Sequence, residues 1–162
     1  MGSYLNPGST AFQGSLRSQI YIDKSGLIEK TNTVLGTEQK YVCVSRPRRF
    51  GKSMAANMLA AYYSKGCDSR EMFSEFAISK KEDFTIHLNK YDVIHIDIQW
   101  FLTNCDDIDN FVAFLTKSIL NELKVIYPMV ITSDITTIPQ ALSNIREKTG
   151  NKFIVIIDEW DV

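Results

Sequence analysis

The sequence predicts an α/β domain built around a mostly parallel sheet. Short runs rich in β-branched residues, at 40–45, 91–101 and 152–162, alternate with longer stretches whose apolar residues recur at helical spacing. The length of 162 residues, with 44% hydrophobic and 23% charged residues, suits about one globular domain with a single core. Residues suited to phosphate or metal chemistry follow two of the runs, at strand ends where parallel sheets bind ligands.

The composition excludes several classes of protein. A net charge of -1 gives the whole molecule no electrostatic attraction to nucleic acid or to an acidic membrane. The three cysteines lie far apart and form no CxxC pair, which argues against a disulfide framework and against a zinc site. No apolar stretch approaches the roughly 20 residues that span a bilayer, and the N-terminus lacks the order of a signal peptide. We therefore expect a cytoplasmic protein without membrane contact.

The first part of the chain predicts an arm, a helix and a strand. Residues 1–20 are polar and rich in glycine and serine, and we expect an irregular N-terminal arm ahead of a domain that covers residues 21–162. Asp23 is the expected N-cap of the first helix. Residues 40–45, KYVCVS, predict a buried strand with Cys43 as a small apolar side chain inside it. The residues expected to face the core near the first helix are Ile22, Leu27 and Ile28.

Helices and strands alternate in the remainder of the chain. Residues 54–66 are rich in Ala, Leu and Met, which favour a helix, and end at Gly66, a natural C-cap. Residues 91–101 predict a strand and residues 107–127 an amphipathic helix. Another helix is expected from about residue 138 to Gly150. Residues 152–162 contain five consecutive apolar residues, which is typical of a strand buried on both faces.

The loop of residues 45–53, SRPRRFGKS, ends as a phosphate-binding loop does, although Arg46 stands where the pattern G-x-x-x-x-G-K-S/T has its first glycine. Gly51 lets the backbone approach a phosphate, Lys52 supplies a charge for the β and γ phosphates, and the Ser53 hydroxyl suits Mg2+. A turn through Arg46 and Pro47 can keep the backbone amides converging on the phosphate. The residues expected to bind the nucleotide are Arg46, Pro47, Arg48, Arg49, Phe50, Gly51, Lys52, Ser53 and Met54.

Two acids at the end of the last predicted strand complete this chemistry. In FIVIIDEWDV, Asp158 is placed to hold Mg2+ and Glu159 to orient or deprotonate the attacking water. Either motif alone is common in unrelated sequences. Both together, each at the end of a predicted strand and about 100 residues apart, are far more specific.

Three stretches of the chain, YIDKSGLIE, SRPRRFGKSMAANMLAAYYS and FIVIIDEWD, resemble the bacterial AAA-ATPase-like family. Members of that family typically carry RPRRFGKS as their phosphate loop, and the resemblance covers nearly the whole chain. It implies a P-loop NTPase fold of the AAA-like, additional-strand type, with ATP and Mg2+ as cofactors. It also implies that Lys52 and Ser53 occupy the Walker A positions for phosphate and Mg2+, and that Asp158 and Glu159 are the metal-holding and catalytic acids of Walker B.

Family members usually continue beyond this point, and many end in a PD-(D/E)xK nuclease-like domain. We therefore expect this chain to be the N-terminal portion of an ATPase domain that is incomplete at its C-terminus. In the additional-strand topology, the next strand inserts between the loop strand and the strand that bears the two acids. Without it two sheet edges stay unpaired, which favours self-association. The resemblance implies hydrolysis of ATP to ADP that drives a downstream activity, with DNA as a partner of the nuclease-like domain.

The residues leave two alternatives open. One is a nucleotide sensor that binds ATP without hydrolysis and signals through a partner. The other is a nucleic-acid-binding module that uses Arg46, Arg48 and Arg49, although these arginines also suit ion pairs that fix the loop. Two smaller expectations concern the surroundings of the site. His95 and Asp97 share a strand face and are expected to be hydrogen-bonded structural residues, with Asp97 close to the nucleotide end, whereas Tyr21 and Ile22 are expected near the adenine.

Overall fold

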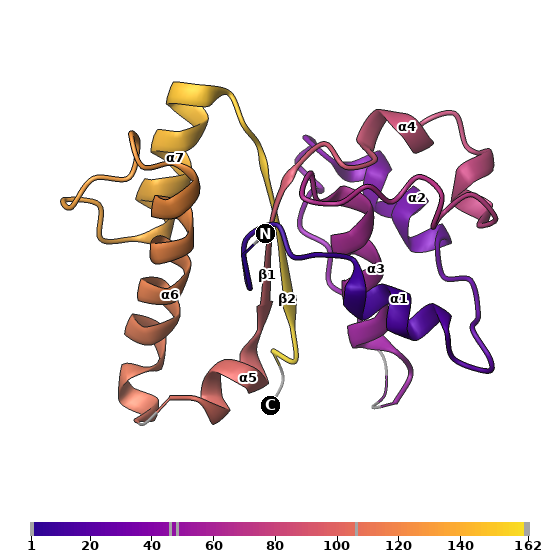
Figure 1. Cartoon of the computed structure of the whole chain (residues 1–162), viewed down its shortest axis with the longest axis horizontal. Coiled ribbons are helices and arrows are strands. Elements are labelled where there is room, and N and C mark those ends of the chain that lie inside the picture. The colour runs from indigo at the N-terminus through magenta and orange to yellow at the C-terminus, as the bar shows by residue number, and fades with distance from the viewer. Residues whose placement is uncertain (1, 46, 48, 106, 161–162) are drawn as a thin grey trace.

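The computed structural model describes residues 2–45, 47, 49–105 and 107–160. Figure 1 shows two strands through the middle of the molecule, with α6 and α7 on one side and α1 to α4 on the other. Helices therefore cover both faces of the sheet. In chain order, the elements are α1 (Thr10–Leu16), α2 (Gly26–Val34), α3 (Lys52–Tyr63), the 3-10 helix η1 (Ala77–Lys80), α4 (Phe84–His87), β1 (Asp92–Asp97), α5 (Ile98–Thr103), the 3-10 helix η2 (Ile108–Asn110), α6 (Phe111–Ile126), α7 (Ile138–Thr149) and β2 (Phe153–Asp158).

The two strands are parallel neighbours, as the sequence predicts for an α/β domain. Asp92 pairs with Phe153 at one end of the ladder, and Asp97 pairs with Asp158 at the other. Parallel neighbours need a crossover, and here the chain makes it through α5, α6 and α7. The structure thus confirms a parallel sheet flanked by helices. Asp97 and Asp158 lie together at the C-terminal ends of its two strands.

A separate hydrophobic cluster packs on each face of the sheet. Side chains alternate along β1, so Val93 joins the cluster around α1, α2 and α3 while Ile94 joins the cluster around α6 and α7. Tyr62 and Met58 of α3 lie in the first cluster, and Leu123 of α6 lies in the second. The sheet is therefore the middle layer of three, which fixes the start of α3 relative to the strand ends.

The prediction of a buried strand is wrong at residues 40–45, whereas the last predicted strand forms as β2 but is not buried on both faces. Residues 40–45 have no strand assignment, and Tyr41 is 86% exposed; Cys43 is exposed rather than buried. Val155 and Ile157 of β2 are 48% and 52% exposed. The reason is the same for both segments. Residues 40–45 and the outer edge of β2 face each other across a cavity, and no strand of the described residues lies between them.

The helix predictions hold better than the strand predictions. Gly150 ends α7 in the left-handed conformation (φ 71°) and donates its N–H to Arg146, as expected of a glycine C-cap. Helix α6 is also confirmed. The strand expected at 91–101 is wrong beyond Asp97, because the Asp97 carboxylate accepts the N–H of Trp100 and starts α5.

Two expectations about helix ends are also wrong. Helix α3 ends at Tyr63 rather than at Gly66. The N-cap of α2 is Ser25, and Asp23 instead accepts the N–H groups of Ser25 and Ala77. Ile22 is 69% exposed, whereas Ile28 is fully buried as predicted.

The N-terminal stretch is packed into the domain instead of forming an irregular arm. It contains α1, and both Leu5 and Phe12 are fully buried. Leu5 forms an isolated antiparallel bridge with Ile94, and Asn6 donates its N–H to the carbonyl of Val93 at 2.7 Å. The stretch is therefore held against the free edge of β1.

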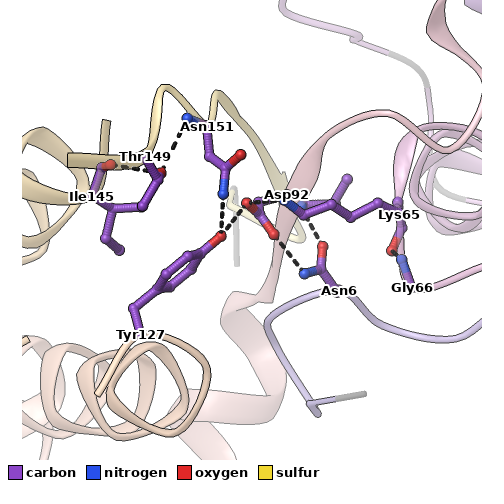
Figure 2. Close-up of polar contacts among 10 residues, drawn as sticks. Asn6, Lys65, Gly66, Asp92, Tyr127, Ile145, Thr149 and Asn151 are labelled. Carbon is purple, nitrogen blue, oxygen red and sulfur yellow. Dashed lines mark hydrogen bonds and ion pairs between the residues drawn. The ribbon is translucent and has the colours of Figure 1, made fainter. Parts of the chain in front are cut away.

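A buried polar cluster ties this stretch to the rest of the fold (Figure 2). The side chain of Asp92, fully buried at the start of β1, accepts hydrogen bonds from Asn6 (2.7 Å) and Tyr127 (2.5 Å) and pairs with Lys65 (2.7 Å). Asn151 donates to the Tyr127 hydroxyl at 2.9 Å. The cluster joins the N-terminal stretch, the α3–β1 connection, the end of α6 and the α7–β2 loop. It lies at the N-terminal ends of the strands, whereas Asp158 lies at their C-terminal ends. It is a structural feature of the fold.

In the part of the chain that the structure describes, every helix is too short or too polar to cross a bilayer.

Candidate functional site

The loop before α3 makes a sharp turn that needs a glycine at its end. Gly51 is the N-cap of α3 and has a left-handed backbone (φ 76°), a conformation that costs glycine nothing. Arg49, two residues earlier, is also left-handed (φ 69°), and the N–H of Phe50 bonds the carbonyl of Pro47 at 3.3 Å. The turn delivers Lys52 and Ser53 as the first residues of the helix, where the aligned peptide dipoles give partial positive charge.

The described residues cover the predicted loop only in part. Arg46 and Arg48, both predicted to contact the nucleotide, lie outside the described residues. Pro47 and Phe50 are exposed and Met54 is partly buried. The geometry of the site therefore depends on the end of the loop, the first turn of α3 and the end of β2.

The two motifs predicted to act together are in contact. The Ser53 hydroxyl donates to the Glu159 carboxylate with an oxygen-to-oxygen distance of 3.3 Å, which is long for a hydrogen bond of this type. Glu159 has a left-handed backbone (φ 52°), which is costly for a residue other than glycine. The N–H of Glu159 donates to the Asp158 carboxylate at 3.0 Å, which stabilises this backbone conformation. With the backbone in this conformation, the Glu159 side chain reaches Ser53 of α3.

Asp158 and Asp97 stand side by side at the strand ends. They are register partners in adjacent parallel strands, and their side chains lie on the face that carries α3. Asp158 is buried and Asp97 is exposed. Their adjacent carboxylates concentrate negative charge at the ends of the two strands. Within the described residues, no group of three or more His, Cys, Asp or Glu side chains is placed to hold a metal ion.

His95 lies beneath these two acids on the same face. Burial lowers the pKa of its imidazole, and the charges of Asp158 and Asp97 act against that effect. Its Nε2 atom is buried and has no hydrogen-bond partner within the described residues. The expectation of a hydrogen-bonded structural histidine is therefore wrong for Nε2.

A cavity of about 700 Å³ adjoins these residues, within the size range of small-molecule sites. Side chains of α3, of β2 and of residues 40–44 line it, and most of this lining is apolar. Lys52, Asp158 and Glu159 are among its polar lining residues. The cavity thus places the loop lysine and the two acids around one space.

Comparison with known proteins assigns the family. A family described as predicted AAA-ATPase matches residues 11–162, which is nearly the whole chain. The chain belongs to this AAA-ATPase-like family. Searches among curated proteins and among solved structures each found no match. Membership supports a general ATPase-like function with nucleotide binding, and the small parallel sheet flanked by helices is compatible with an AAA-like fold.

Tyr21 of this AAA-ATPase-like domain packs in the core instead of lining the cavity. Its ring stacks on Phe76 with a centroid distance of 5.5 Å and meets the edge of Phe12 at 6.0 Å. Burial raises the pKa of its hydroxyl to about 12. The residue does not line the cavity at the site, so its expected place near an adenine finds no support.

Sequence reasoning missed one cation at the site of this AAA-ATPase-like domain. Lys24, which precedes α2, donates from Nζ to the carbonyl of Phe50 at 3.0 Å. A Cβ atom on Gly51 would overlap this ammonium group. The available signal was the position of Lys24 inside YIDKSGLIE, one of the three stretches that carry the family resemblance.

Proposed function

We propose that this domain binds ATP with Mg2+ at the start of α3, as a P-loop ATPase with Walker A and Walker B motifs. The observation that carries the proposal is the contact of Ser53 with Glu159, which joins the loop motif to the acidic motif. The N-terminus of a helix attracts phosphate through its partial positive charge, and hydroxyl and carboxylate oxygens are the ligands that Mg2+ prefers. Groups that suit a phosphate and groups that suit a cation therefore lie together at the start of α3.

Lys52, Ser53 and Asp158 would bind different parts of the Mg2+–ATP complex. The ammonium of Lys52 would neutralise the β and γ phosphate oxygens, and the N–H groups of the loop and of the first turn of α3 would hold the phosphate chain. Ser53 and Asp158 would hold the Mg2+ ion, which would supply positive charge to the phosphate oxygens. The donor set fits such an ion because it consists of oxygen atoms alone.

Glu159 is the residue proposed to act on the attacking water. Its carboxylate already lies at the start of α3, and a carboxylate within hydrogen-bond reach of a water can orient it or accept its proton. The products would be ADP and phosphate. Hydrolysis would drive a downstream activity, for which nuclease action on DNA is our suggestion.

Glu159→Gln tests the assignment of roles. The substitution keeps the size of the side chain and removes its charge, so ATP binding should persist while release of ADP falls by at least about 100-fold. Binding and ADP release are measured on the same preparations of wild type and variant. Equal, negligible turnover in both, with ATP still bound, would favour the nucleotide sensor over the enzyme.

Nucleic-acid binding is tested separately. Filter binding of single- and double-stranded DNA at rising salt should show negligible affinity with a shallow salt dependence, because the net charge is -1. A steep dependence that disappears on neutralising Arg49 would instead support the nucleic-acid-binding module.

A further inference from the structure

Lys24 reaches the turn before α3 from a distant part of the chain. Its Nζ atom donates to the carbonyl of Phe50 at 3.0 Å and lies where a side chain on Gly51 would stand. Glycine at position 51 therefore serves two purposes, since it adopts the left-handed backbone and leaves room for a second ammonium group beside the loop.

The segment that carries Lys24 is held firmly on both sides. The Asp23 carboxylate accepts the N–H of Ser25 at 2.7 Å and the N–H of Ala77 at 2.9 Å, one on each oxygen. Ser25 is fully buried, and its hydroxyl accepts the N–H of Ile78 at 3.2 Å. These contacts fix the backbone around Lys24, so the ammonium reaches the loop from a rigid base.

We propose that Lys24 is a second cation for the phosphate chain, acting beside Lys52 from outside the loop; this rests on the proposed nucleotide site. An ammonium group has three donors, and the Phe50 carbonyl uses one of them. Each oxygen of Asp23 already accepts an amide proton. Lys24 is partly buried, where a charge interacts more strongly than in open water.

The competing explanation is that Lys24 only shapes the turn through its bond to Phe50. The two roles differ in what they need from the side chain. Shaping the turn needs a donor, which the amide of Gln provides without charge. Binding phosphate needs the charge, which Arg keeps. A charge effect must also be larger for ATP than for ADP, because ATP carries more negative charge.

The experiment is an equilibrium titration of ATP and ADP, each with Mg2+, and of inorganic tripolyphosphate into wild type, Lys24→Gln, Lys24→Arg and Lys30→Gln. Lys30 is exposed on α2 and supplies the matched loss of one charge. Lys24→Gln should weaken ATP and tripolyphosphate binding by about tenfold and ADP binding by less. Lys24→Arg and Lys30→Gln should stay within about twofold of wild type.

Other outcomes separate the inference from the function on which it rests. If wild type binds ATP and Lys24→Gln binds it equally well, or loses ATP and ADP to the same extent, the second-cation role is wrong and the nucleotide site stands. If wild type binds neither ATP nor tripolyphosphate, both proposals fall. Thermal unfolding without ligand checks that each variant is folded, and Lys24→Met replaces Lys24→Gln if the latter is not.

Discussion

The hydroxyl of Ser53 lies 3.3 Å from the carboxylate of Glu159, although the two residues are 106 positions apart in the sequence. Ser53 lies in the first turn of α3, and Glu159 directly follows β2. Their contact therefore depends on the packing of α3 against the face of the sheet on which Ile156 lies. The fold thus joins a loop that suits phosphate to an acid that suits water activation.

The left-handed backbone of Glu159 predicts a conflict between stability and activity. Glu159→Gly and Glu159→Ala both remove the carboxylate, but only glycine relieves the backbone at φ 52°. We expect the glycine variant to exceed the alanine variant in free energy of unfolding by about 1 kcal/mol, with both inactive as ATPases. Urea unfolding of the two variants measures the difference. Equal stabilities would show that the backbone is not strained in solution.

The buried cluster around Asp92 predicts a large loss of stability at a distance from the site. Asp92→Ala leaves Lys65, Asn6 and Tyr127 without their acceptor and should cost about 3 kcal/mol. Tyr127→Phe removes two hydrogen bonds, the one to Asp92 and the one from Asn151, and should cost about 2 kcal/mol. Urea unfolding at neutral pH measures both values.

The exposed ion pair of Lys81 with Glu29 provides the control for that prediction. The two groups are 2.6 Å apart with nearly half of each side chain exposed to solvent, so Glu29→Ala should cost clearly less than Asp92→Ala. A cost for Asp92→Ala no greater than that for Glu29→Ala would contradict the structural role of the cluster.

The two histidines predict that the domain loses stability between about pH 7 and pH 5. Burial lowers the pKa of both His87 and His95, with the nearby acids opposing the effect in each case. The unfolded chain therefore binds protons near the ordinary pKa of about 6.5 while the folded domain does not, and the free energy of unfolding falls as the pH drops. This contribution is complete above the unfolded pKa.

A double variant isolates the histidines from other groups that titrate in acid. His87→Gln with His95→Gln should flatten the dependence of unfolding free energy on pH between 7 and 5, measured without metal or nucleotide. The same slope in wild type and double variant would mean that the histidines titrate equally in the folded and unfolded states.

The sequence predicted those parts of the fold that depend on local signals. Helix α7 ends at Gly150 because a glycine can take the left-handed C-cap, and the hydrophobic run of β2 makes a strand. The meeting of Ser53 and Glu159 was also expected from the pairing of the two motifs, although the strand predicted ahead of Ser53 has no strand assignment. Local patterning and the order of motifs were enough for these features.

The features that the sequence did not predict depend on tertiary contacts. Residues 40–45 have the composition of a strand, but a strand needs a hydrogen-bonding neighbour, and none of the described residues supplies one. The chain turns into α5 after Asp97 because one carboxylate caps a helix, which an alternating pattern does not reveal. Lys24 lies beside Gly51 because the segment before α2 is held against η1, where Asp23 accepts the N–H of Ala77. Asp23 and Ala77 are more than 50 positions apart, so local sequence patterns do not reveal this contact.

Titration of wild type and Lys52→Ala with ATP in the presence of Mg2+ tests the central claim most directly. Lys117→Ala, which removes one charge from α6 on the other face of the sheet, is the control. We predict saturable binding of one ATP by wild type and control, and weakening of about 10- to 100-fold in Lys52→Ala. Absence of binding by wild type, or equal binding by Lys52→Ala, would contradict the claim that the start of α3 is a nucleotide site.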